Sequence, residues 1–134
     1  MTDDQFARAF ENCEITGENF HHHDHIRLAW IYLKRYGPEV APARIAAAIR
    51  AFASHLGKPD KYHETVTIAW MRLIQQAADC YTFQQVAAAF PRFLDKSYLN
   101  EFYSAETLQS ATARESLVEP DKKPLPSTAP SVVK

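Results

Sequence analysis

Apolar residues recur every three or four positions along most of this chain, and this spacing constrains its fold more than any other feature. The segment 22–36 carries one such stripe, formed by Ile26, Ala29, Trp30 and Leu33. The segment 62–80 carries another, formed by Val66, Ala69, Trp70, Leu73 and Ala77. This period places apolar side chains on one face of an α-helix. Because glycine is scarce, at 3 residues, while alanine is abundant, we expect an all-α fold.

Breaks in the helical pattern divide the chain into about five to six helices that would pack as a compact bundle. We expect helices over residues 3–14, 22–36, 41–56, 62–80 and 83–90, followed by helical turns over 93–102 and 105–117. Glycine and proline mark the ends of two of them, at Gly37-Pro38 and at Gly57. The expected N-caps are Thr2, Asp60, Thr82 and Ser104.

The length of 134 residues suits one domain, which we place at residues 1–118. From Glu119 onward the chain changes character, because prolines are frequent and few side chains are suited to burial. We expect residues 119–134 to form an extended or disordered tail, or a strap laid over the surface.

Charge and composition exclude several classes of partner. The formal net charge is −1, so the chain has no basic field for a nucleic-acid backbone. No apolar run reaches the roughly 20 residues that span a membrane. The start, Met1-Thr2-Asp3-Asp4, has the wrong charge for a secretory leader, and Cys13 and Cys80 lack a C-x-x-C partner. We therefore expect a cytoplasmic protein with reduced thiols.

Parts of the sequence recur at a shift of about 40 positions. Leu28-Ala29-Trp30 recurs as Ile68-Ala69-Trp70, the segment 45–52 recurs loosely as 86–93, and His22 falls on His63. Two helical hairpins descended from one would place one histidine from each near a pseudo-twofold axis. Alanine-rich helices also align with each other without common descent, so both explanations stay open.

Histidine is concentrated in Phe20-His21-His22-His23-Asp24-His25, at the start of the second expected helix. His22 and His25 are three positions apart, which places them on one face, and they continue the apolar stripe. We therefore expect these two side chains to point inward. His21 and His23 fall on other faces and are expected to be exposed.

A third histidine, His63, precedes Val66 and Trp70 by three and seven positions, on the apolar face of the fourth expected helix. If the two helices pack side by side, His22, His25 and His63 converge. Three imidazoles can hold one divalent transition metal (Zn, Fe, Cu or Ni) and leave a position open for water or substrate. Glu64 is the candidate general base or further ligand.

The hypothesis favoured by this pattern is a small metal-dependent enzyme that acts on a small molecule through a three-histidine centre. Tyr62, Thr67 and Tyr103 are expected at the rim of the site. Three alternatives stay open: a metal-free functional pocket, a metal sensor or carrier, and a helical protein-interaction module whose histidines are structural. Alanine-rich helical faces are also compatible with a homodimer.

The histidine motifs resemble those of a group of small bacterial helical proteins of unassigned function. The shared pattern is Phe20-x-His22-x-x-His25 with Leu28-Ala29-Trp30, then Lys61-Tyr62-His63-Glu64-Thr65, Tyr103-Ser104 and Pro120-Asp121. It extends from about Phe20 to Leu125 and implies no activity. The chain does not match hemerythrin, whose ligand set needs further H-x-x-x-E and H-x-x-x-H pairs, and its histidines are paired along the chain differently from those of DinB-like bundles.

Overall fold

The helical pattern is realised as six α-helices joined by short 3-10 turns, and the computed structural model, which describes residues 1–126, contains no strand in that range. The helices are α1 (Asp3–Glu11), α2 (His22–His55), α3 (Glu64–Ile74), α4 (Phe83–Ala89), α5 (Ala105–Gln109) and α6 (Ala111–Glu115). The 3-10 turns are Gly17–Asn19, Pro59–Lys61, Gln75–Ala77, Pro91–Leu94 and Lys96–Glu101. The prediction of an all-α fold is therefore confirmed.

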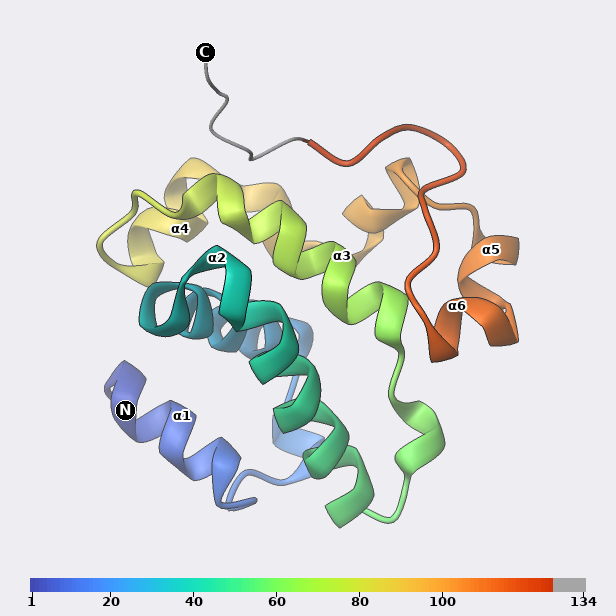
Figure 1. The fold of residues 1–134 in the computed structure, drawn as a ribbon. Coiled ribbons are helices and arrows are strands. Elements are labelled where there is room, and N and C mark those ends of the chain that lie inside the picture. The colour runs from blue at the N-terminus through green and yellow to red at the C-terminus, as the bar shows by residue number, and fades with distance from the viewer. Residues whose placement is uncertain (127–134) are drawn as a thin grey trace.

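Helix α2 is two helices joined at Gly37. This glycine has φ 84° and ψ 166°, a conformation open almost only to glycine, and the chain changes direction there (Figure 1). Pro38 follows and begins the second segment, where its missing N–H costs no helical hydrogen bond. The predicted stop at Gly37-Pro38 is confirmed, although helical structure resumes at once and not at residue 41.

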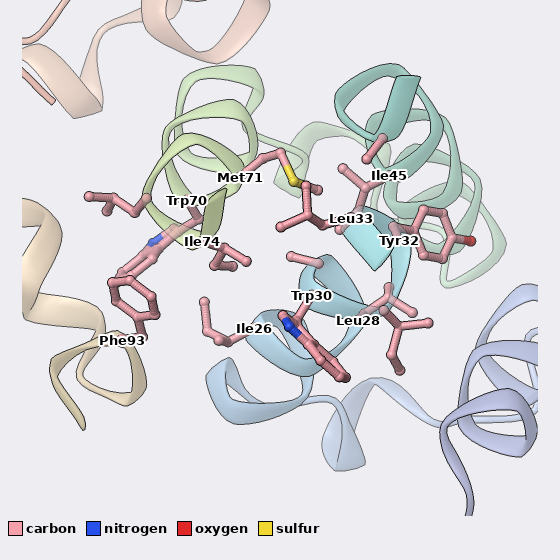
Figure 2. Close-up of a cluster of buried hydrophobic side chains, with 14 of the residues drawn as sticks. Ile26, Leu28, Trp30, Tyr32, Leu33, Ile45, Trp70, Met71, Ile74 and Phe93 are labelled. Carbon is pink, nitrogen blue, oxygen red and sulfur yellow. The ribbon is translucent and has the colours of Figure 1, made fainter. Parts of the chain in front are cut away.

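The core lies mainly between α2 and α3, which make the most extensive contact between two elements. Figure 2 shows side chains of both segments of α2 meeting those of α3. Both tryptophans are buried, with Trp30 3% and Trp70 1% exposed. Other core residues include Ile26, Leu33, Ile45, Met71 and Ile74. Burial of each large apolar side chain contributes about 1.5–3 kcal/mol, so this contact fixes the positions of both helix starts.

Side-chain caps define most of the helix starts. Thr2, Thr82 and Ser104 each accept a hydrogen bond from the first turn of the helix that follows, as predicted. The prediction for Asp60 is wrong, because residues 59–61 form a separate 3-10 turn. The cap of α3 is instead His63, whose ring accepts a hydrogen bond from the Val66 amide.

The C-terminal segment is a strap across the fold (Figure 1). Buried Thr65 of α3 donates its hydroxyl to the Ser116 carbonyl (2.9 Å) and accepts from the Val118 amide (3.1 Å). The Tyr103 hydroxyl donates to the Val118 carbonyl, and the Lys122 amide donates to the Phe102 carbonyl. Residues 119–126 thus follow the strap alternative, and the rest of the predicted tail, 127–134, lies outside the described residues.

The two halves of the predicted internal repeat have different secondary structure, which does not decide whether they share a common origin. Segment 45–52 lies inside α2, whereas segment 86–93 crosses from α4 into the turn Pro91–Leu94. The second hairpin is therefore much shorter than the first, and common descent stays a hypothesis. No helix of the described residues is long and apolar enough to cross a membrane.

Two helices end in the same hydrogen-bond pattern, but with different residues in the left-handed position. After α2, Gly57 (φ 73°) donates to Ser54, and Lys58 donates to Ala53. After α1 the equivalent residue is Cys13, the one non-glycine residue with positive φ (58°) in the described part of the chain. A side chain there costs about 1–2 kcal/mol.

Cys13→Gly is expected to raise the free energy of unfolding by about 0.5–1 kcal/mol, because relief of this strain exceeds the entropy that glycine adds to the unfolded chain. Urea unfolding measures the change. Gly57→Ala is the matched control: a Cβ there has no atom within 4 Å, so the expected loss of about 1 kcal/mol reports backbone strain alone. A destabilised Cys13→Gly protein would contradict the interpretation.

Thr65→Val is expected to destabilise the fold by about 2–3 kcal/mol, because it leaves a strap carbonyl and a strap amide without their partner. Thr67→Val is the matched control on the same helix. The Thr67 hydroxyl donates to the His63 carbonyl one turn away and makes no bond to the strap, so its removal should cost about 1 kcal/mol or less. Equal losses in thermal or urea unfolding would show that the strap does not depend on Thr65.

Candidate functional site

His22 begins α2 and connects it to the segment after α4. Its Nε2–H donates to the Phe93 carbonyl oxygen at 2.8 Å, and its ring packs against Trp70, with 4.7 Å between ring centroids. Burial lowers the pKa of His22. The Phe93 hydrogen bond and the Asp95 carboxylate oppose this shift, while the nearby Lys96 ammonium reinforces it. The imidazole is therefore neutral at neutral pH, with its lone pair on Nδ1.

His25 lies one turn further along α2, and its ring is perpendicular to that of His22 (89°, centroids 6.3 Å apart). Its Nε2 is buried and has no hydrogen-bond partner among the described residues. Burial, with a smaller contribution from His22, lowers the pKa of His25 to about 4. A buried polar atom without a partner costs about 1–3 kcal/mol, and such atoms are rare in folded proteins.

The four histidines at the start of α2 have the exposure that their helical positions predict. His21 and His23 are exposed, whereas His22 and His25 are partly buried. The inward orientation predicted for His22 and His25 is thus confirmed.

His63 has a structural environment that uses both of its ring nitrogens. Nδ1 accepts from the Val66 amide at 3.2 Å and caps α3, while Nε2–H donates to the Leu108 carbonyl at 2.6 Å. Coordination of a metal would require one of these bonds to break. His63 therefore joins the start of α3 to α5 and presents no available lone pair.

Glu64, the predicted base, is engaged away from the two histidines. Its carboxylate accepts from the Tyr62 hydroxyl (2.5 Å) and from the Arg50 guanidinium (3.2 Å). The Arg50 guanidinium also lies 4.8 Å from the centroid of the Tyr62 ring. This network holds the loop before α3 against α2, and Glu64 is not part of the cavity described next.

A cavity of about 330 Å³ lies beside the histidine pair, with apolar walls and a polar mouth. We call it the histidine cavity. Its lining consists of His22, His25, Val66, Trp70, Lys96, Ser97, Leu99, Asn100 and Leu108. A larger hollow of about 740 Å³ lies under the strap, lined largely by prolines and charged side chains. We place the candidate site in the smaller cavity, because only there do imidazoles with available nitrogens meet apolar walls.

The polar residues at the mouth differ from those expected. Tyr103 and Thr67 are buried and bond to backbone carbonyls, and Tyr62 bonds to Glu64, so none of the three lines the cavity. The mouth is formed instead by Lys96, Ser97 and Asn100 of the turn Lys96–Glu101. Asp95 caps this turn through the Ser97 amide, a local signal that predicts a turn but not where it packs.

The residues present do not fit the predicted three-histidine metal centre. Within residues 1–126, no three histidine, cysteine, aspartate or glutamate side chains are placed so that they could hold a metal ion. Both ring nitrogens of His63 form hydrogen bonds, and the Glu64 carboxylate binds Tyr62 and Arg50. What the structure does assemble is a pair of neutral imidazoles, His22 and His25, at the wall of a small cavity.

Comparison with known proteins adds no assignment to this geometry: no family model, no curated protein and no solved structure matches the chain.

The stability of the fold is expected to fall as the pH decreases from about 6.5 to 4. In this range an unfolded His25, with its ordinary pKa of 6.5, binds a proton that the buried ring does not bind, so protons favour the unfolded state. The full shift corresponds to about 3 kcal/mol. Urea unfolding of the native protein and of His25→Gln between pH 4 and 7.5 measures the difference in slope.

His23→Gln is the control for this experiment, because His23 is exposed and adjacent in sequence. It should keep the pH dependence of the native protein, while His25→Gln should show a clearly shallower one. Parallel profiles for all three proteins would mean that His25 is not kept neutral by the fold.

Proposed function

We propose that this chain binds a small molecule in the histidine cavity. The observation that carries the proposal is His25, which lines a cavity of about 330 Å³ and whose buried Nε2 has no hydrogen-bond partner among the described residues. A ligand group that forms a hydrogen bond with this nitrogen would remove the free-energy penalty of leaving it unpartnered. Ligand binding would therefore raise the folding stability.

The cavity has the composition of a small-ligand site. Its volume lies in the usual range, roughly 300–1,000 Å³, and its walls are largely apolar with a few polar groups that can orient a ligand. Its lining comes from four elements: α2, α3, the turn Lys96–Glu101 and α5. Its exposed polar residues come from the turn Lys96–Glu101, and His22 hydrogen-bonds to Phe93 in the preceding turn, Pro91–Leu94.

The second candidate function is metal-dependent chemistry at the histidine pair. The hydrogen bond from His22 Nε2–H to a backbone carbonyl is the support that metal-ligating histidines usually have, and it leaves Nδ1 as a donor atom. Together with His25, two nitrogens would hold the ion, and small molecules would complete its coordination. Near His22 the Lys96 ammonium would repel a cation and the Asp95 carboxylate would attract it, with Lys96 the larger effect, so we rank small-molecule binding without a metal first.

A fragment set containing uncharged, cationic and anionic members tests the first proposal by nuclear magnetic resonance. Binding should shift the imidazole signals of His22 and His25 and the indole signal of Trp70, while those of Trp30, which does not line the cavity, stay unchanged. Val66→Phe, which fills the cavity, should abolish the shifts. Ile68→Phe, on another face of α3, is the matched control and should retain them.

Elemental analysis of untagged protein, purified without a nickel column, separates the two candidates. Small-molecule binding without a metal predicts no stoichiometric metal. About one equivalent of a single metal, lost in both His22→Ala and His25→Ala but kept in His63→Ala, would instead establish the metal-dependent function. Fragment shifts that persist in Val66→Phe, or no shifts from any fragment in the native protein, would overturn the proposal of a small-molecule site.

A further inference from the structure

Lys96 is a cation at the mouth of the histidine cavity without a carboxylate partner in the described part of the chain. Six of the 13 other lysine and arginine side chains in the described residues have one, and these are Arg27, Arg35, Arg50, Arg72, Arg92 and Lys123. The nearest carboxylate in sequence, Asp95, accepts hydrogen bonds from the Ser97 amide and hydroxyl. The positive charge of Lys96 is thus available to a ligand.

The cavity below Lys96 suits a flat apolar group. The Trp70 indole and the His22 imidazole lie against each other, and the His25 ring is perpendicular to that of His22. Val66, Leu99 and Leu108 complete the apolar lining. Aromatic rings favour tilted and edge-to-face contacts, so these three rings can offer such contacts to a further ring in the cavity.

We infer that the ligand of the histidine cavity is a small aromatic carboxylic acid, whose carboxylate lies at Lys96 and whose ring lies against Trp70. This inference rests on the proposed function and specifies its ligand class. Ser97 and Asn100, on the same turn as Lys96, supply further polar groups at the mouth. Charge-assisted hydrogen bonds from an ammonium to a carboxylate are stronger than neutral ones, which gives the acid its advantage over an uncharged analogue.

Three probes of one shape and different charge test the inference: benzoate, benzamide and benzylamine. Each is titrated into the native protein at low salt, and the signals of His22, His25 and Trp70 are followed. Benzoate should bind roughly three- to fivefold more tightly than benzamide, as expected for an exposed ion pair, and benzylamine should bind most weakly. Added salt should reduce the preference for benzoate.

Lys96→Gln should bind benzoate and benzamide equally. Lys58→Gln is the matched control: Lys58 is an exposed lysine that lines a different apolar hollow, and its replacement should leave the preference unchanged. Equal binding of the three probes at the histidine signals, or tighter binding of benzamide or benzylamine, would overturn the inference and leave the proposed small-molecule site intact. No shift with benzoate would also overturn it, and the fragment set then decides the proposed function separately.

Discussion

The packing of α2 against α3 is the contact on which the rest of the structure depends. It buries apolar side chains of α3 against both segments of α2 (Figure 2), and residues near the start of each helix line one cavity. This arrangement is possible because Gly37 allows α2 to turn and present two segments to one partner. The histidine cavity lies at one end of this contact, with His22 and His25 from α2 and Val66 and Trp70 from α3.

Histidine serves two different purposes at the two helix starts. At α3 the ring of His63 replaces the usual serine, threonine or aspartate cap, and its other nitrogen binds the Leu108 carbonyl. At α2 the rings of His22 and His25 come after the cap position and face the cavity. The histidines at the two helix starts thus precede a tryptophan by similar distances in the sequence but have different environments. The hydrogen-bond partners of each ring nitrogen distinguish a structural histidine from one that is available to a ligand.

Helical period and helix-breaking residues predicted the fold well, whereas the site was predicted only in part. The stop at Gly37-Pro38 and the caps at Thr2 and Thr82 depend on neighbours within a few residues, and these predictions are confirmed. The orientation of His22 and His25 follows from the same helical period. The carbonyl partner of His63 and the position of Lys96 depend on contacts across 45 or more residues or on the packing of a short turn, which period and spacing do not encode.

The polar atoms at the cavity lower the folding free energy of a domain of this size, and groups that destabilise a fold are an argument for function. Total folding free energies are about 5–15 kcal/mol, so an unpartnered buried nitrogen at His25 consumes an appreciable part of the whole. An apolar side chain at position 25 would continue the stripe of Ile26, Ala29 and Leu33 and remove this penalty. The neighbouring Lys96 adds a cation beside the His22 ring, which further disfavours its protonated form. Trp30 Nε1 is also buried without a partner among the described residues, but His25 differs from Trp30 because it lines a cavity that a cation, Lys96, also lines, and this combination favours a binding site.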